Sequence, residues 1–536
     1  MKPTNNLTRP TLTDLYQLSM IYAYWIAGKH EDEATFDLFF RRCPFGGEYA
    51  IFAGLEECIR LMENFRFTEE DINFLKEEGG PMHGCEEGFF DWLRTLDCSK
   101  MKISAVREGT IVFPKIPLIR VSGPLAVGQL LETPFLNLVN FPTLIATNAS
   151  RFRLAAGPNK TLLEFGLRRA QGPDGAVSAS RYSYMGGFDG TSNVLASQLF
   201  GIPVKGTHAH AFISSFTGLS DLKRRKLKDL RGEYAEIGEE VDFASIVLQI
   251  RQQLGLTKTN EGELAAMIAY AIAFPTKFLA LVDTYDTLKS GVPNFICVAV
   301  ALKRLGYKPV GIRLDSGDLA FLSMEASTMF DKIGAYVDCD LSRCIIVASN
   351  DIDESILWAL RNEEHAIDAF GIGTHLVTCK TQPALGGVYK LVSINGNPRI
   401  KLSNEPGKIT IPGEKKTFRL YGHDSHPAID LIMEEDERDP VAGEKILCRH
   451  PFDEMKRAII IWKRVHRLDR LIWDGERKFD PEKLTVIKDY VTAQLDEMRE
   501  DHLRPTNPAP YKVAVSESLY SRIRKLREEE TPVAVL

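Results

Sequence analysis

The sequence predicts an α/β protein with a βα barrel over residues 150–384 and an α+β domain that residues 1–149 and 385–536 build together. In the central part, apolar β-prone runs alternate with helical patterns, which is typical of parallel βα units. Each run ends on Gly, Asp, Ser or Asn, and right-handed crossovers bring such ends to one face of a barrel. The outer segments mix strand and helix patterns without this alternation.

Both outer segments contain recognisable elements. The first opens with an amphipathic helix, whose apolar residues recur at helical spacing: Leu12, Leu15, Leu18, Tyr22 and Ile26. Two β-rich runs, 111–116 and 117–121, predict strands later in the same segment. The C-terminal segment begins with the strand-like run 388–394 and ends in charged helices. We therefore expect one mixed domain from the two chain ends.

Six runs predict the strands of the barrel. They are 161–168, 202–206, 278–286, 310–318, 344–351 and 369–375. Taken alone, the acidic pair Asp315 and Asp318 fits a turn and a helix cap, and Asp283 fits a capping carboxylate. Six polar endings in series are hard to explain by capping, and strand ends are where a barrel carries its chemistry. We expect these ends to converge.

Composition bounds the class of protein. The 536 residues are 44% hydrophobic and 26% charged, which is ordinary for a globular protein of two or three domains. A net charge of −6 argues against nucleic acid as the main partner. The N-terminus lacks an apolar signal region, and the most apolar window, 264–282, is interrupted by Pro275-Thr-Lys277, so neither secretion nor a membrane span is expected. Nine cysteines without a Cys-x-x-Cys pair suggest neither disulfides nor zinc, and favour a cytoplasmic protein.

Two polar clusters receive a structural interpretation. The basic run 223–228 is flanked by acidic residues, so a solvated surface helix is favoured over a nucleic-acid patch. His423 and His426 have no evident third ligand, so a loop pair is favoured over a metal site. The chain also lacks the P-loop, His-Glu-x-x-His and Gly-x-Ser-x-Gly motifs, which disfavours a P-loop kinase, a zincin and a serine hydrolase.

The segment 205–216 places His208 and His210 where a predicted strand turns toward a helix. Histidine shuttles protons near neutral pH and can act as a nucleophile. An isolated histidine is more often structural than functional. The polar strand ends elsewhere in the barrel favour a functional role for this pair.

The chain resembles the nicotinate phosphoribosyltransferases. The motifs that carry the resemblance are 13–17 (Thr-Asp-Leu-Tyr-Gln), 164–168 (Glu-Phe-Gly-Leu-Arg), 187–193 (Gly-Phe-Asp-Gly-Thr-Ser-Asn), 206–210 (Gly-Thr-His-Ala-His), 311–317 (Gly-Ile-Arg-Leu-Asp-Ser-Gly), 371–374 (Gly-Ile-Gly-Thr) and 507–511 (Asn-Pro-Ala-Pro-Tyr). They span most of the chain, and their ordered combination is far more specific than any one of them. The resemblance implies a barrel of the type II phosphoribosyltransferase kind, irregular and often incomplete, beside a domain built from both chain ends.

The resemblance also implies a reaction. Nicotinate and phosphoribosyl pyrophosphate would give nicotinate mononucleotide and pyrophosphate, coupled to ATP hydrolysis, as the entry step of NAD synthesis from the free acid. Tyr16 and Phe165 are the candidates for stacking on the pyridine ring. In the family the tyrosine comes from a neighbouring subunit, which implies a homodimer with shared active sites. Without the resemblance, both aromatic residues fit an ordinary core equally well.

Three residues are expected to select the base. Arg313 is the candidate for gripping the nicotinate carboxylate through two parallel hydrogen bonds, with Thr207 assisting. Ser192 stands where the nicotinamide-using relatives have an aspartate, which would repel a carboxylate. This combination favours nicotinate over nicotinamide.

The phosphate groups are expected at the later strand ends. Gly371, Gly373 and Thr374 would cradle the ribose phosphate with backbone N–H groups, with Asn350 assisting. Arg168 is assigned to the pyrophosphate.

The remaining assignments concern the carboxylates and the histidines. Asp283 and Asp315 are expected to hold Mg²⁺ or ribose hydroxyls, because this ion prefers oxygen ligands. The family motif reads Gly-Thr-x-Ala-His, so His210 matches the histidine that ATP phosphorylates, and His208 occupies the variable position.

Three alternatives remain open at this point. Nicotinamide phosphoribosyltransferase shares much of the constellation, and quinolinate phosphoribosyltransferase shares the fold but is shorter and uses no ATP. A non-catalytic nucleotide sensor could retain the barrel and its site.

Overall fold

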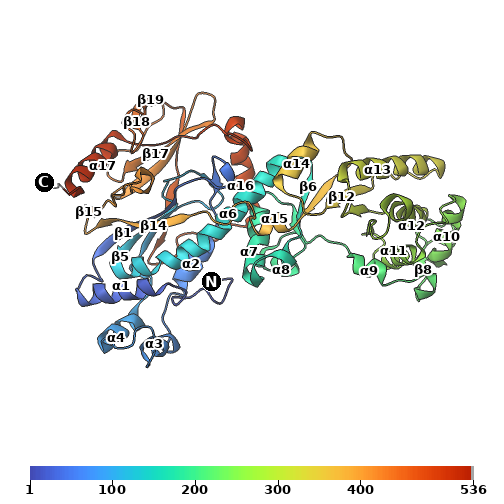
Figure 1. Cartoon of the computed structure of the whole chain (residues 1–536), viewed down its shortest axis with the longest axis horizontal. Coiled ribbons are helices and arrows are strands. Elements are labelled where there is room, and N and C mark those ends of the chain that lie inside the picture. Colours follow the sequence, from blue (N-terminus) through green and yellow to red (C-terminus); the bar gives the residue numbers. More distant parts are fainter. Residues whose placement is uncertain (533–536) are drawn as a thin grey trace. The chain divides into compact units, whose positions relative to one another are not determined.

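The structure is a computed structural model that describes residues 1–532, and the chain divides into two compact units (Figure 1). Unit 1 comprises Met1–Ala149, Tyr182–Gly187 and Cys379–Leu536. Unit 2 comprises Ser150–Arg181 and Phe188–Thr378. Within residues 1–532, no helix is both long and apolar enough to cross a bilayer.

Unit 1 contains two six-stranded sheets and one two-stranded sheet. The first has the order β15-β14-β1-β5-β3-β21, the second β19-β18-β22-β17-β16-β20, and the small one β2-β4. Their strands are β1 (Glu33–Phe40), β2 (Ala50–Ile51), β3 (Lys102–Val106), β4 (Ile111–Val112), β5 (Ile119–Pro124), β14 (Gly387–Ile394), β15 (Asn397–Pro398), β16 (Lys415–Tyr421), β17 (Pro427–Glu434), β18 (Lys445–Arg449), β19 (Arg457–Ile461), β20 (Arg464–Arg467), β21 (Asp469–Asp474) and β22 (Val513–Val515). Because β14 and β21 pair into a sheet with β1 and β3, the two chain ends fold together, as the sequence predicts.

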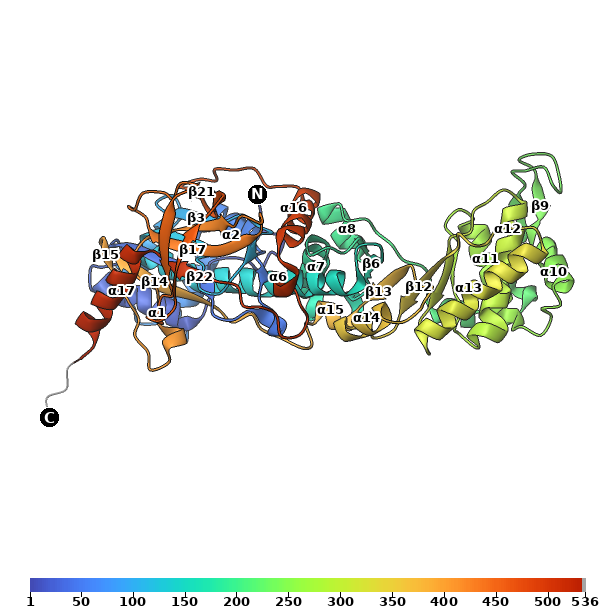
Figure 2. The same cartoon turned by 90° about the horizontal axis from the view of Figure 1, so that it is seen from above.

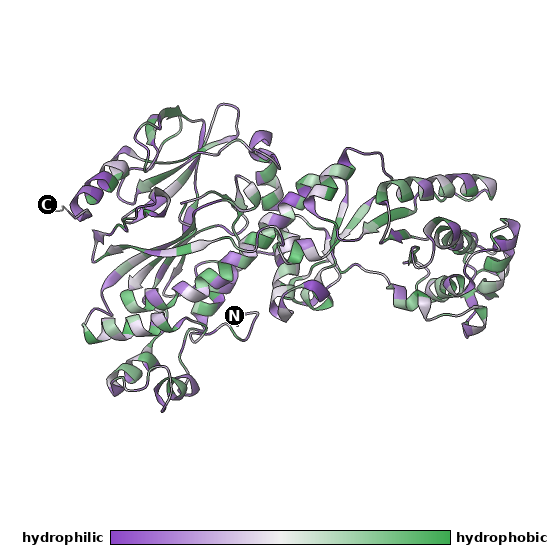
Figure 3. Cartoon of the chain, viewed as in Figure 1, coloured by the Kyte–Doolittle hydropathy of each residue, from purple (hydrophilic) through white to green (hydrophobic). Residues whose placement is uncertain are grey.

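The helices of unit 1 include the predicted opening helix. They are α1 (Leu15–Ile26), α2 (Leu55–Glu63), α3 (Glu69–Lys76), α4 (Glu87–Thr95), α5 (Leu125–Leu130), α16 (Leu484–Glu497) and α17 (Glu517–Glu530), with the short helices η1 (Pro44–Gly46), η5 (Pro406–Lys408) and η6 (Glu500–His502). The long helix α6 (Glu132–Ala156) begins in this unit. Figure 3 shows mostly hydrophilic residues on α17, the helix next to the C-terminus.

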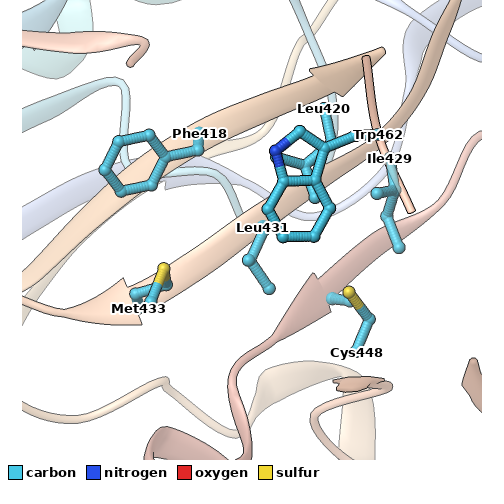
Figure 4. Packing of buried hydrophobic residues seen from close by; sticks show 8 residues of the cluster. Phe418, Leu420, Ile429, Leu431, Met433, Cys448 and Trp462 are labelled. Atoms are coloured by element: carbon cyan, nitrogen blue, oxygen red, sulfur yellow. The ribbon is translucent and has the colours of Figure 1, made fainter. Parts of the chain in front are cut away.

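The second sheet of unit 1 has its own core (Figure 4). Trp462 lies among apolar side chains from β16, β17 and β18, including Leu420, Leu431 and Cys448. Beside this core, Arg419 on β16 and Asp430 on β17 form a buried ion pair. Both guanidinium contacts, Nε to Oδ1 and Nη2 to Oδ2, are 2.8 Å long.

Unit 2 is built on a parallel sheet of order β10-β11-β12-β13-β6-β7. Its strands are β6 (Thr161–Glu164), β7 (Gly190–Thr191), β10 (Leu279–Leu281), β11 (Gly311–Leu314), β12 (Ile345–Ser349) and β13 (Ala369–Ile372). Five of the six predicted runs form β6, β10, β11, β12 and β13. The run at 202–206 does not: it makes a single parallel bridge between Thr191 and Val204. Within residues 1–532 no strand ladder joins β10 to that segment, so the barrel is irregular and incomplete.

The helices of unit 2 lie on two sides of the sheet. Figure 2 shows α10, α11, α12 and α13 together on one side of β12 and β13, and α7, α8, α14 and α15 on the other. The helices are α7 (Gly172–Met185, which ends in unit 1), α8 (Val194–Phe200), α9 (His210–Ser214), α10 (Phe243–Gln253), α11 (Glu261–Ala273), α12 (Val292–Arg304), α13 (Leu319–Tyr336), α14 (Glu354–Arg361) and α15 (Thr374–Val377), with η2 (Leu167–Arg169), η3 (Leu219–Asp221) and the π-helix η4 (Thr287–Gly291).

The basic run 223–228 is not the surface helix that we expected. Its last residues form β8 (Lys226–Lys228), which pairs with β9 (Glu240–Asp242) in an antiparallel hairpin. The physical reason is alternation: Leu227 is buried between two exposed lysines, which is a strand pattern. Arg224 and Arg225 lie 3.4 Å from Glu240 and Asp242, so the run is solvated and paired with acidic residues. His423 and His426 lie in a loop, as predicted.

Replacing Arg419 by Met should strongly destabilise unit 1. The change leaves Asp430, whose side chain is 0% exposed, without its counter-charge, and removing one partner of a buried pair costs about 3–5 kcal/mol. The free energy of unfolding in urea measures the effect. Arg438→Met is the matched control, because Arg438 pairs with Glu444 at the surface and such pairs contribute only about 0–1 kcal/mol. Equal losses in the two variants would contradict this account.

Candidate active site

The neighbouring strands β10, β11 and β12 bring four polar residues together at their carboxyl ends. Asp283 follows β10, Arg313 and Asp315 stand at the end of β11, and Ser349 ends β12. Because the strands are parallel neighbours, their carboxyl ends meet. The sequence predicted the first three residues, and the structure adds Ser349.

An ion pair between Arg313 and Asp315 organises these strand ends. Arg313 donates from Nη2 to Asp315 Oδ1 over 3.0 Å and from Nε to Ser349 Oγ over 2.7 Å. Ser349 in turn donates to Asp315 Oδ1. Burial raises the pKa of Asp315, but the Ser349 hydrogen bond and the Arg313 charge outweigh it, so this pKa lies below its usual value. Asp315 therefore carries a negative charge at neutral pH.

Asp283 is the second carboxylate of the cluster. Its Oδ2 accepts hydrogen bonds from the Asp315 backbone N–H over 3.0 Å and from Ser316 Oγ over 2.5 Å. Its Oδ1 is buried and makes no hydrogen bond with the described residues. One carboxylate oxygen thus remains available to a ligand.

His210 faces both carboxylates. Its Nε2 lies 3.6 Å from Asp315 Oδ2 and 3.9 Å from Asp283 Oδ1, and its Nδ1 lies 3.2 Å from Thr284 Oγ1. The side chain is 46% exposed, so a ligand in solution can reach the ring. The structure therefore brings His210, Asp283 and Asp315 together, as expected for residues at convergent strand ends.

His208 has a different environment. Its Nε2 accepts a hydrogen bond from the Leu281 backbone N–H over 3.4 Å, and its ring packs edge-on against Tyr270. Burial lowers its pKa to about 4, and the Arg313 and His210 charges act in the same direction, while the Ala209 carbonyl opposes them. The ring is neutral at pH 7 and its acceptor nitrogen is occupied.

The ring of Phe165 lies near Arg313 and packs closely against Gly371. The Arg313 guanidinium carbon is 5.4 Å from the centre of the Phe165 ring, which is a cation–π distance. A Cβ added at Gly371 would come within 2.5 Å of the ring carbon Cδ2. Gly371 lies inside β13, so the structure gives this glycine a packing reason that the sequence did not indicate.

A buried carboxylate holds the ends of β6 and β7. Glu164, which is 1% exposed, accepts hydrogen bonds from Ser180 Oγ over 2.7 Å, from Thr191 Oγ1 over 2.5 Å, and from the Gly166 backbone. Sequence reasoning gave Glu164 no role, although an acidic residue at the end of an apolar run was the available signal. Its contacts fix the backbone on either side of Phe165 and just before Ser192, which is half-buried at the end of β7.

The residues assigned to phosphate also lie at the carboxyl ends of strands in this sheet. Asn350 follows β12 with a φ of 122°, an unusual conformation for a side chain other than glycine. Gly373 and Thr374 stand at the start of α15. Arg168, in η2, is exposed and has no ion-pair partner among residues 1–532. Thr207 donates to the His208 carbonyl over 3.3 Å.

Tyr16 belongs to unit 1. It lies on α1 with about half of its surface exposed, and burial, followed by the charge of Glu132, raises its pKa. The adjacent Gln17 is fully buried and donates to Glu132 over 3.1 Å, which anchors the helix. Tyr16 is thus a half-exposed aromatic ring on a fixed helix.

Unit 1 also holds a basic cluster that sequence reasoning missed: Arg41, Lys115, Lys390 and Lys401. Burial and the charge of Arg41 lower the pKa of Lys115 to about 8. Burial likewise lowers the pKa of Lys390, with Arg41 and Lys401 adding to the effect against the nearby Glu132. Arg41 Nε is buried and makes no hydrogen bond with the described residues. These cations repel one another, which is the arrangement expected of an anion site.

The comparisons of sequence and of structure with known proteins indicate the same protein family. A family model for the nicotinate phosphoribosyltransferase N-terminal domain matches residues 11–140, and the model for the C-terminal domain of the same family matches residues 414–523. Nicotinate phosphoribosyltransferase 1 of Arabidopsis thaliana is 52% identical over 546 residues, which cover 100% of this chain and 96% of the relative.

Solved structures are also similar. The crystal structure of human nicotinic acid phosphoribosyltransferase superimposes with a TM-score of 0.85 at 42% identity, covering 96% of this chain and 99% of that one. The nicotinate-nucleotide pyrophosphorylase of Pyrococcus furiosus superimposes with a TM-score of 0.59 at 19% identity, covering 91% and 95%, and shows the fold alone.

Replacing Gly371 by Ala should displace the Phe165 ring, because the added Cβ would lie too close to it. Overpacking of this kind costs about 1–3 kcal/mol. We expect a lower melting temperature and a raised KM for a substrate ring that stacks on Phe165. Gly175→Ala is the matched control, since the nearest neighbour of its added Cβ would lie 3.9 Å away. Equal effects of the two substitutions on KM would show that Phe165 does not bind the substrate ring.

Proposed function

The chain belongs to the nicotinate phosphoribosyltransferase family, and we propose that it makes nicotinate mononucleotide and pyrophosphate from nicotinate and phosphoribosyl pyrophosphate with ATP hydrolysis through a phosphohistidine. Its family places it as an enzyme of NAD biosynthesis. The observation that carries the proposal is the cluster at the ends of β10, β11 and β12, where a stacked ring, a guanidinium, two carboxylates and an accessible histidine meet.

Transfer to the pyridine nitrogen requires orientation more than covalent chemistry by the protein. The nitrogen attacks the ribose C1 as the bond to pyrophosphate breaks, and the electron pair leaves with the pyrophosphate. We assign the base to the face of Phe165, where its carboxylate can pair with the Arg313 N–H groups that Ser349 and Asp315 leave free. Ser192 adds no negative charge that would repel this carboxylate.

His210 is the proposed phosphate acceptor. A ring nitrogen attacks the γ-phosphorus of ATP, ADP leaves, and water later takes the phosphoryl group from the histidine as inorganic phosphate. The exposed ring of His210 supports this choice over His208, whose Nε2 already accepts the Leu281 N–H. The phosphorylated state would bind phosphoribosyl pyrophosphate more tightly, which links ATP hydrolysis to transfer.

Asp283 and Asp315 fit a Mg²⁺ site that substrates complete. The buried Asp283 Oδ1 without a hydrogen bond and the Asp315 Oδ2 beside it are the hard oxygen ligands that this ion prefers. No group of three or more His, Cys, Asp or Glu side chains in the described part of the chain forms a site by itself. Phosphate oxygens would supply further ligands, and the bound ion would neutralise their charge.

We propose a homodimer with shared active sites, in which Tyr16 comes from the neighbouring subunit. The exposed apolar side chains Val194, Leu195 and Leu199 on α8 suit burial against a second chain. The nine cysteines are all free in the structure, which supports the reducing cytoplasm as the location.

The purified enzyme should convert nicotinate in preference to nicotinamide and quinolinate, and faster with ATP than without. Nicotinamide lacks the charge that pairs with Arg313 and would leave the guanidinium uncompensated. The measurement compares kcat/KM for the three bases with phosphoribosyl pyrophosphate, at saturating ATP and without it.

Ser192→Asp is the variant that tests the basis of this preference. A carboxylate beside the base should penalise nicotinate strongly and nicotinamide little, because like charges interact more strongly in a partly desolvated site. Ser192→Asn is the uncharged control of the same size. A wild type that prefers nicotinamide, or an unchanged preference in Ser192→Asp, would show that this account of the base is wrong. No turnover of any base would favour a nucleotide sensor.

His210→Ala should abolish ATP hydrolysis that depends on nicotinate while leaving slow, ATP-independent transfer. The phosphohistidine assists the transfer and is not its nucleophile. An acid-labile phosphoenzyme should form in the wild type with γ-labelled ATP and be absent from the variant. His208→Ala should be milder. Equal ATP hydrolysis in the two variants, or no phosphoenzyme in the wild type, would remove His210 from this role.

A further inference from the structure

The barrel of unit 2 has two open edges, and one segment connects them. At the first edge, Lys205 donates to the Thr191 carbonyl and Thr191 donates to the Pro203 carbonyl, so residues 203–205 extend the sheet beyond β7. At the other edge stands β10, which pairs with β11 on its inner side only. Residues 206–210 run from the first edge toward the second and carry His210.

On β10, backbone N–H groups alternate between the two sides of the strand. Val282 N–H donates to the Arg313 carbonyl on β11. Leu281 N–H therefore points to the open side, where a neighbouring strand would normally accept it. It donates instead to Nε2 of His208, over 3.4 Å. A histidine side chain thus stands where the barrel lacks a backbone carbonyl.

Aromatic neighbours fix the His208 ring in this position. The ring centre lies 4.7 Å from that of Tyr270 on α11, in edge-on geometry, and 5.3 Å from that of Phe212 on α9. The ring touches three elements at once: the edge strand, the helix that His210 begins, and α11.

We propose that His208 is a positioning residue for His210: its Nε2 closes the barrel by accepting the Leu281 N–H, and this contact holds the segment 206–210 so that the His210 ring faces Asp283 and Asp315. The proposal rests on the phosphohistidine role proposed for His210. It does not make His208 a phosphate acceptor, because its accepting nitrogen is occupied. The lowered pKa of His208 agrees, since a protonated ring has no lone pair to offer Leu281.

The geometry explains why the contact acts on His210. Only Ala209 separates the two histidines. Nδ1 of His210 contacts Thr284, three residues after Leu281, so both histidines are bound to the same stretch that follows β10. Loss of the His208 contact would release the segment at one end and let the His210 ring drift from the carboxylates. A displacement of about 1 Å in a reacting group can cost a factor of about 100 in rate.

The experiment compares two substitutions that separate hydrogen bonding from packing. His208→Phe keeps an aromatic ring against Tyr270 and Phe212 but removes the acceptor. His208→Gln removes the ring but returns an oxygen near the position of Nε2. With γ-labelled ATP, we expect His208→Phe to slow phosphoenzyme formation about 10- to 100-fold, and His208→Gln to retain most of the wild-type rate. ATP-independent transfer and the melting temperature should be similar in all three proteins.

Each outcome has a distinct meaning. If the wild type forms a phosphoenzyme and His208→Phe forms it equally fast, the inference is overturned. If His208→Gln is as slow as His208→Phe, an acceptor at this position does not restore the rate, which also overturns the inference. Absence of a phosphoenzyme from the wild type would instead overturn the function proposed for His210, and the positioning role with it.

A spectroscopic measurement tests the contact without relying on a variant that folds. In the ¹⁵N spectrum of the histidine rings, assigned by loss of one signal in His208→Gln, we expect a neutral His208 with its proton on Nδ1 and an unprotonated Nε2 at pH 6. A proton on Nε2 would be incompatible with acceptance of the Leu281 N–H.

Discussion

The ion pair between Arg313 and Asp315 is the interaction on which the rest of the site depends. The two residues are two positions apart on β11, so their side chains leave the same face of the strand and meet at its end. Ser349, from the neighbouring strand, bonds to both. The pair therefore fixes the guanidinium near Phe165 on one side and presents a carboxylate oxygen to His210 on the other. The base site and the phosphorylation site that we propose would thus share one pair of charges.

Glu164 is a second carboxylate that is fixed by hydrogen bonds. It stands at the end of β6, as Asp315 stands at the end of β11. Its charge is hidden from solvent and satisfied by hydroxyl and backbone donors from β7, α7 and the turn after β6. A buried carboxylate is costly unless donors surround it, so these contacts are strongly coupled to the local fold. The contact with Gly166 holds the backbone next to Phe165, whose ring we propose to stack on the base. A ring that is held in place loses less motion when it binds a flat substrate.

The sequence predicted the parts of this molecule that local pattern determines. Alternation of apolar runs with helices identified five of the six strands of the parallel sheet in unit 2, and their polar ends identified Asp283, Arg313 and Asp315. It failed where tertiary context decides. The basic run 223–228 pairs as a hairpin because Leu227 is buried, which depends on β9. The basic cluster around Arg41 comes from segments more than 300 residues apart and has no local signature.

The contrast between the two histidines shows how little sequence separates a buried, hydrogen-bonded ring from an exposed one. His208 and His210 are two residues apart and in a strand would share a face, but the chain enters α9 at His210 and the two rings diverge. One ring goes into an aromatic layer, where burial lowers its pKa, and the other remains half-exposed beside two carboxylates. Composition and spacing are the same for both. The end of the strand and the start of the helix decide which ring stays exposed beside the carboxylates.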